Sequence, residues 1–168
     1  MLGSLQASVA RRRLLLGGAI GGFGALVAGT AGAQTPTPAA PSPDFEILQY
    51  DPPRRFAAGA RVGNIIYLAG EDGKVWTSGD EWYMIPGGII PQTERCYENI
   101  RASLRHFGSD LQYIFKQTTY YINYDDRNLN AEVRRRYLPR PVPGTAVQVA
   151  SLSDPDSLIE VDVMAVIP

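Results

Sequence analysis

Apolar and polar residues alternate most strictly near the carboxyl end of the chain. Between residues 158 and 167, Ile159, Val161, Val163 and Ala165 would point to one side of an extended chain, with Glu160 and Asp162 on the other. Side chains of a strand point alternately to opposite faces, so this pattern predicts a strand with one buried face. Concentrations of β-branched and aromatic residues predict further strands at residues 45–48, 56–61, 65–69, 113–124 and 145–152.

Two segments carry apolar residues at the spacing of a helix. The first begins near Pro91 and ends before Gly108, a residue typical of the position after a helix, and its apolar face comprises Tyr97, Ile100, Leu104 and Phe107. The second follows Asp125 or Asp126, either of which could cap it, and continues to Tyr137. Its predicted apolar face comprises Leu129, Val133 and Tyr137.

Residues 71–88 contain four glycines and are predicted to form a long loop. The resulting order, β-β-α-β-α-β-β, predicts an α+β fold in which two helices cover one face of a single-layer sheet. The opposite face is then uncovered. A small domain with a partly apolar open face tends to bury it against further copies of itself, so a homo-oligomer with clefts between subunits is expected.

The first 44 residues differ in composition from the rest of the chain. Arg11, Arg12 and Arg13 precede a glycine-interrupted apolar run at 14–28, and Ala31-Gly32-Ala33 resembles a cleavage site. This order predicts a signal peptide at 1–33, and the paired arginines followed by leucines favour a twin-arginine type. An ordinary secretory signal and an uncleaved membrane anchor are the alternatives. We expect a periplasmic or otherwise exported protein without a stable membrane anchor after cleavage.

A proline-rich linker is predicted at 34–44, followed by a single domain at 45–168. Removal of residues 1–33 takes away three of the 16 basic side chains and none of the 17 acidic ones, so the mature chain is mildly acidic. This balance argues against a nucleic-acid partner. The chain has one cysteine, Cys96, and one histidine, His106, which argues against a metal site. No cofactor is expected. We interpret His106 as a cation near the end of the first helix, although it could act as a catalytic base.

Several segments of the domain, in order, resemble the RidA (reactive intermediate deaminase) family. They are VGNIIYLAG at 62–70, FKQTTY at 115–120, TAVQVASL at 145–152 and IEVDVMAV at 159–166. The resemblance implies the same element order, assembly as a homotrimer with three clefts between subunits, and hydrolysis of enamines or imines such as 2-aminoacrylate to a 2-keto acid and ammonia.

Most of the residues that the resemblance assigns to the family's site differ here in kind. The family's arginine, which holds a substrate carboxylate, corresponds to Gly144, before Thr145. The positions of its serine, glutamine and tyrosine fall on Ala69, Glu71 and Phe56. An asparagine of the second helix corresponds to Glu132, and the acidic residue of the last strand is retained as Asp162. Arg140 could swing in to replace the missing arginine.

Two groups of side chains are candidates for chemistry or binding. Glu71, Asp162 and Glu132 could converge on one cleft and there supply a general acid or base or bind a cation. They could instead lie separately on a loop and solvent-exposed faces. Aromatic residues near Trp76 and Trp82 could cover the cleft and bind a flat or apolar ligand, or pack on a neighbouring subunit.

Three functions follow from these observations. The first is a homotrimer that binds a small molecule in clefts between subunits, without the family's usual 2-imino-acid deamination. The second is an imine or enamine deaminase with altered substrate contacts. The third is a non-catalytic oligomer with a chaperone-like or scaffold role.

Overall fold

The computed structural model describes residues 45–50, 54, 56–78 and 81–168, so the predicted signal and linker lie outside the described residues. The main sheet contains seven strands: β1 (Phe45–Leu48), β2 (Gly59–Val62), β3 (Ile65–Leu68), β4 (Glu71–Asp72), β7 (Ile114–Tyr121), β8 (Gly144–Gln148) and β9 (Ile159–Val166). Its order is β1-β2-β3-β9-β7-β8, with β4 paired to β9 beyond the end of β3. All pairs are antiparallel except β7 and β8.

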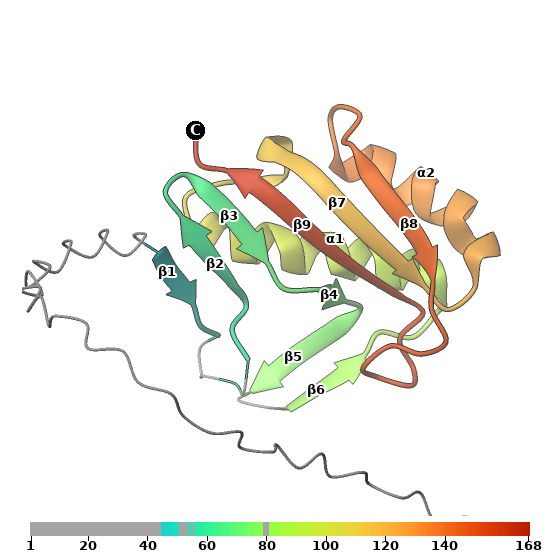
Figure 1. Cartoon of the computed structure of the whole chain (residues 1–168). Helices are drawn as coiled ribbons and strands as arrows, with labels where there is room; N and C mark the ends of the chain where they lie inside the picture. The colour runs from blue at the N-terminus through green and yellow to red at the C-terminus, as the bar shows by residue number, and fades with distance from the viewer. Residues whose placement is uncertain (1–44, 51–53, 55, 79–80) are drawn as a thin grey trace, which may run out of the picture. The chain divides into compact units, whose positions relative to one another are not determined.

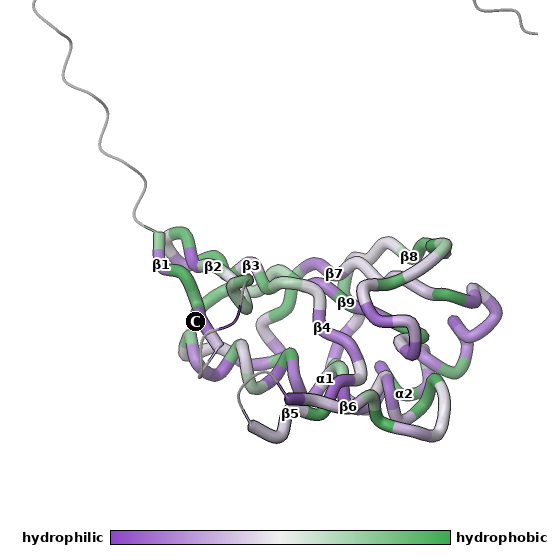
Figure 2. Tube along the Cα trace, turned by 90° about the horizontal axis from the view of Figure 1, so that it is seen from below, coloured by the Kyte–Doolittle hydropathy of each residue, from purple (hydrophilic) through white to green (hydrophobic). Residues whose placement is uncertain are grey.

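Two α-helices, α1 (Ile89–His106) and α2 (Arg127–Tyr137), lie on one side of this sheet (Figures 1 and 2). Short 3-10 helices, η1 (Leu111–Tyr113) and η2 (Tyr124–Asp126), precede β7 and α2. The predicted α+β fold with two helices on one face is therefore confirmed. No helix among the described residues is both long and apolar enough to span a membrane.

The core lies between β9, β7 and the inner face of α1. Ile159, Val161, Val163 and Ala165 are buried, so the predicted alternation of the last strand is confirmed. From α1, Tyr97, Ile100 and Leu104 pack into the same cluster. The helix begins two residues earlier than predicted because Gly88, at a φ of 86°, forms its cap. It ends as predicted, with Gly108 at a φ of 75° just beyond it.

The predicted apolar face of α2 is wrong at one position. Val133 is buried and Tyr137 half-buried, but Leu129 is 40% exposed and its neighbour Asn130 is buried instead. The Asn130 amide accepts a hydrogen bond from the Tyr121 hydroxyl at 2.8 Å and donates to the Thr93 hydroxyl at 3.4 Å. A buried amide is tolerated where it has such partners, and hydropathy alone does not reveal them.

The prediction of a long loop at 71–88 is also wrong. Its first two residues form β4, and a separate two-stranded sheet follows from β5 (Lys74–Ser78) and β6 (Glu81–Met84). Trp76 pairs with Trp82 across it. Glycines at the borders of these short strands hid the β-forming residues between them.

The face of the sheet opposite the helices is open in the single chain. Tyr67 and Met164 are register partners, as are Val147 and Tyr120, and these residues share the face of Glu160. Tyr67 is 43% exposed, and all five residues of β8 are exposed. The predicted homo-oligomer would use this face, and its assembly stays a prediction.

Candidate functional site

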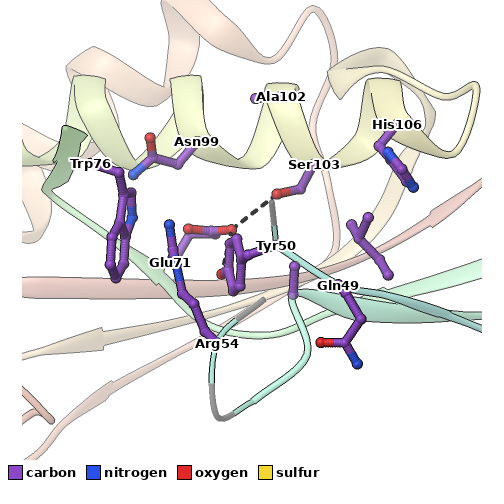
Figure 3. Close-up of a pocket in the computed structure, with 11 residues that line it drawn as sticks. Gln49, Tyr50, Arg54, Glu71, Trp76, Asn99, Ala102, Ser103 and His106 are labelled. Carbon is purple, nitrogen blue, oxygen red and sulfur yellow. Dashed lines mark hydrogen bonds between the residues drawn. The ribbon is translucent and has the colours of Figure 1, made fainter. Parts of the chain in front are cut away.

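A cavity of about 390 Å³ opens between α1 and the segment that follows β1 (Figure 3). The helix contributes Asn99, Ala102, Ser103 and His106, which share one face because helical residues three and four apart are neighbours. Across from them lie Leu48, Gln49, Tyr50, Arg54, Ala58, Glu71 and Trp76. We call this space the helix-side cavity. Its volume is within the range of sites for small molecules.

A second hollow of about 260 Å³ adjoins it and shares Tyr50, Glu71 and Trp76 as walls. Its other lining residues are Phe56, Ala69, Gly70, Asp72, Lys74, Ser153 and Glu160. We call this the adjoining hollow. Because Glu71 borders both spaces, its carboxyl group is the natural centre of the candidate site.

The short strand β4 determines where the Glu71 side chain points. Glu71 is the register partner of Val161, whose side chain belongs to the core, so both lie on the helix side of the sheet. The Glu71 carboxyl accepts hydrogen bonds from the Ser103 hydroxyl at 3.1 Å and the Tyr50 hydroxyl at 3.4 Å (Figure 3). The next residue, Asp72, is the register partner of Glu160, and both lie on the opposite side of the sheet. Asp72 also forms a salt bridge with Lys74.

Burial strongly changes the acidity of this carboxyl group. Loss of hydration raises the pKa of Glu71 from 4.5 to about 7, although the hydrogen bond from Ser103 opposes this increase. A carboxyl group with this pKa is present in both protonation states near neutral pH, as a general acid or base requires. Burial and the charge of Glu71 also raise the pKa of the Tyr50 hydroxyl, which therefore stays protonated as a donor.

Arg54 occupies the space between two aromatic rings at the edge of the helix-side cavity. Its guanidinium carbon lies 3.6 Å from the ring centre of Tyr50 and 2.9 Å from that of Trp76. The positive charge of Arg54 lowers the pKa of Glu71, but by less than burial raises it. The site thus combines a buried carboxyl group, a cation and aromatic walls.

The structure brings together three of the residues predicted from the resemblance. Phe56, Ala69 and Glu71 all line the adjoining hollow. Trp82 lines neither space, although it packs edge-to-face on Trp76 with ring centres 6.3 Å apart. His106 lies in the last turn of α1, as predicted, and also borders the helix-side cavity.

The predicted convergence of three carboxylates does not occur within one chain. Asp162 shares the open face of the sheet with Glu160, whereas Glu71 points to the helix side. The Asp162 carboxylate accepts hydrogen bonds from the Thr118 amide and the Tyr120 hydroxyl, each at 3.1 Å. Glu132 is exposed on α2, whose buried face is formed by other residues. Of the two acidic residues on β9, Glu160 lines the adjoining hollow together with Glu71, whereas Asp162 does not.

The position at which the resemblance places the family's carboxylate-binding arginine is Gly144, the first residue of β8. Gly144 pairs with Gln117, and the neighbouring Lys116 ammonium donates to the Thr145 hydroxyl at 3.1 Å. Arg140 does not extend to this position, because its guanidinium donates to the backbone carbonyls of Gln112 and Ile114 at 3.1 and 3.2 Å.

Four site residues were not predicted from the sequence: Tyr50, Arg54, Ser103 and Glu160. Ser103 and Asn99 gave one usable signal, since small polar residues on a helix next to an apolar stripe are candidates for lining a cavity. Arg54 gave none, because its position depends on the ring of Trp76 from a distant segment as well as on that of Tyr50. Among the described residues, no group of three or more His, Cys, Asp or Glu side chains is arranged to hold a metal ion.

Comparison with known proteins agrees with this architecture. The family model described as Endoribonuclease L-PSP matches residues 48–167. A RutC family protein of Pyrococcus abyssi is 32% identical over 111 residues, which cover 66% of this chain and 84% of that protein. The 2-iminobutanoate/2-iminopropanoate deaminase of Mus musculus is 26% identical over 112 residues, which cover 66% of this chain and 80% of that enzyme.

Solved structures show the same fold. RidA from an Antarctic Psychrobacter species matches with a TM-score of 0.61 and 24% identity, over 72% of this chain and 98% of that one. Yeast Mmf1 matches with a TM-score of 0.63 and 19% identity, over 73% of this chain and 98% of that one. The matched family model spans nearly all of the described domain, and the chain therefore belongs to the RidA family, also described as endoribonuclease L-PSP.

Proposed function

We propose that this RidA-family protein is exported through a twin-arginine-type signal, assembles as a homotrimer and binds a small molecule at the Glu71 site. The observation that carries the binding proposal is a buried, titratable carboxyl group between two adjoining hollows with aromatic walls. A perturbed carboxyl group in a concave, partly apolar site is a typical mark of a functional position. The open sheet face supports the assembly proposal, since further copies would bury its exposed apolar side chains.

Deamination of 2-imino acids is not the function we favour. Gly144 offers no side chain where the resemblance places the carboxylate-binding arginine, and the Arg140 guanidinium is engaged by two carbonyl groups. Glu71, Asp72 and Glu160 would repel a carboxylate that entered the adjoining hollow. Removal of one partner of a bidentate charge pair in a desolvated site costs about 2–5 kcal/mol of binding free energy, and Gly144 cannot form such a pair.

Binding is expected to appear as an increase in melting temperature with a panel of small metabolites. A ligand present at about 100 times its Kd stabilises the folded state by about 2.7 kcal/mol, which raises Tm by several degrees. Trp76→Ala removes a wall of both hollows and is expected to abolish the increase. Trp82→Ala is the matched control, because Trp82 belongs to the same hairpin but lines neither hollow.

A chaperone-like protein would give a different result in the same experiment. It would suppress aggregation of an unfolding client, and no metabolite would raise its Tm. That combination would contradict the binding proposal and favour the non-catalytic scaffold.

Imine or enamine hydrolysis is a second candidate, favoured by the pKa of Glu71 near 7 and by relatives named as deaminases. In this reaction a protonated Glu71 would donate its proton to the imine nitrogen. Water would then add to the imine carbon and give a proton to the Glu71 carboxylate. Glu71 would return this proton to the amine nitrogen, the C–N bond would break to release ammonia, and the hydroxyl proton would pass to the Glu71 carboxylate as the carbonyl group forms.

A semicarbazide competition assay tests this second candidate. An amino-acid oxidase generates the imine, and semicarbazide traps what remains of it as a semicarbazone. A hydrolase at micromolar concentration would reduce semicarbazone formation, and Glu71→Gln would restore it because glutamine cannot transfer a proton. Because the carboxylate-binding arginine is missing, we expect unchanged semicarbazone formation with imines of 2-keto acids. A clear reduction by the wild-type protein would establish the deaminase instead.

A further inference from the structure

The rings of Tyr50 and Trp76 enclose the guanidinium group of Arg54. Their ring centres lie 6.1 Å apart with planes inclined by 31°. The guanidinium carbon is 3.6 Å from one centre and 2.9 Å from the other, so it lies close to the line that joins them. We call this arrangement of Tyr50, Arg54 and Trp76 the cation sandwich. A cation enclosed in this way is attracted by the electron-rich faces of both rings.

Negative charge adjoins the cation sandwich. Glu71 shares the helix-side cavity with Arg54, and the Glu71 carboxyl accepts the hydrogen bond of the Tyr50 hydroxyl at 3.4 Å. The adjoining hollow, which shares both rings, adds Asp72 and Glu160 as acidic lining residues and Lys74 as its basic one. Lys74 is paired with Asp72 and thereby neutralises one of these carboxylates.

Other aromatic contacts extend this surface toward the adjoining hollow. Phe56 packs edge-to-face on Tyr50 with ring centres 5.9 Å apart, and it is 56% exposed. Phe56 therefore supplies a further apolar surface beside the two enclosing rings. Aromatic walls with a nearby carboxylate are the chemistry by which proteins recognise alkylammonium groups.

We propose that the ligand of this site is a small organic cation, with an alkylammonium or guanidinium head, that replaces the side chain of Arg54 between Tyr50 and Trp76 and pairs with Glu71. Arg54 then acts as an internal competitor that occupies the position in the free protein. The inference rests on the proposed binding function and specifies its ligand class.

Choline and its uncharged carbon analogue, 3,3-dimethylbutan-1-ol, form the decisive pair of probes because they share shape and differ in charge. The chain has two tryptophans, so Trp82→Phe leaves Trp76 as the one indole and makes its fluorescence a report on the cation sandwich. We expect choline, and methylguanidinium as a second cation, to change this fluorescence at concentrations at least about tenfold lower than the uncharged analogue. Equal responses to choline and the analogue would overturn the proposal.

Two substitutions test the partners of the cation. Glu71→Gln is expected to weaken choline binding about tenfold or more, whereas Glu132→Gln, on the exposed face of α2, is expected to leave it unchanged. Arg54→Ala removes the competitor and is expected to strengthen choline binding about tenfold, because the competent state no longer has to displace a side chain. Arg61→Ala is its matched control, since Arg61 lies on β2 and lines neither hollow.

Circular dichroism of Arg54→Ala shows whether the variant folds, and the choline comparison in the protein with Arg54 intact decides the proposal if it does not. A folded Arg54→Ala variant that binds choline no better than the wild type would contradict the competitor role. If neither cation binds but pyruvate or a neutral metabolite raises Tm in a Trp76-dependent manner, the ligand class is wrong while the proposed binding function stands. If no compound binds at all, both fail.

Discussion

Replacing Glu71 with glutamine is expected to make the protein more stable at pH 8, by about 3 kcal/mol in the free energy of unfolding at 25 °C. The carboxyl group has a pKa of about 7 when folded, against 4.5 for the unperturbed group. Ionised Glu71 must lose hydration on folding, whereas glutamine is neutral and can still accept the hydrogen bonds of Ser103 and Tyr50.

The pH dependence has a definite direction. Between pH 4.5 and about 7 the folded protein binds more protons at Glu71 than the unfolded chain, so the free energy of unfolding falls as pH rises. Below this interval both states are protonated, and the stabilising contribution of the neutral carboxyl group is fully present. Above it both states are ionised, and that contribution has been lost. The glutamine variant should therefore match the wild type near pH 4 and exceed it progressively up to pH 8.

Urea denaturation of both proteins at a series of pH values measures this difference. Burial also raises the pKa of Glu160 above its usual value, and comparison of the two proteins at each pH removes its contribution. Glu132→Gln is the control, because it makes the same chemical change at an exposed position on α2. A constant difference between wild type and Glu71→Gln across the series would mean that Glu71 does not titrate as the structure requires.

A residue whose replacement stabilises the protein must be retained for another reason. Evolution keeps destabilising groups chiefly where function needs them, as in active sites and binding sites. The expected gain in stability of Glu71→Gln and its expected loss of cation binding would together identify Glu71 as a functional residue. A gain in stability without any change in binding would mean that Glu71 is a destabilising buried charge with no role in binding.

Patterns of local sequence were sufficient to predict the parts of the fold that have one buried face. The alternation in β9 and the helical spacing in α1 each identify the buried residues directly, because burial there follows the periodicity of the element. The hairpin of β5 and β6 was not predicted, since its strands are short and bordered by glycine. Asn130 was not predicted as a buried residue, because its burial depends on partners from β7 and α1.

The candidate site was predictable only where the resemblance supplied positions. Glu71 was named in this way, but its burial depends on the pairing of β4 with β9, which are about 90 residues apart in the chain. The cation sandwich depends on Tyr50, Arg54 and Trp76, which come from two segments without a shared periodicity. The choice between Glu160 and Asp162 depends on where β9 passes β4, and alternation alone places both on the same face.

Truncation of Ile100 to alanine is expected to lower the free energy of unfolding by about 2–5 kcal/mol. Ile100 has no exposed surface and packs in the core cluster between α1 and the sheet. Loss of three carbon atoms there removes buried apolar surface and leaves a cavity that close packing cannot fully close. Urea denaturation should show a lower midpoint with an unchanged slope.

Ile90→Ala makes the same chemical change in the first turn of the same helix, where the side chain is 42% exposed. Its cost should stay below about 1 kcal/mol, because little buried surface is lost and alanine favours the helix slightly more. Similar losses for both variants would show that α1 does not pack as described.

Ile100 is flanked on α1 by Asn99 and Ser103 but points away from the helix-side cavity, into the core. Ile100→Ala should therefore reduce stability while leaving choline affinity unchanged in the protein that remains folded. Glu71→Gln should instead increase stability at pH 8 and weaken choline binding.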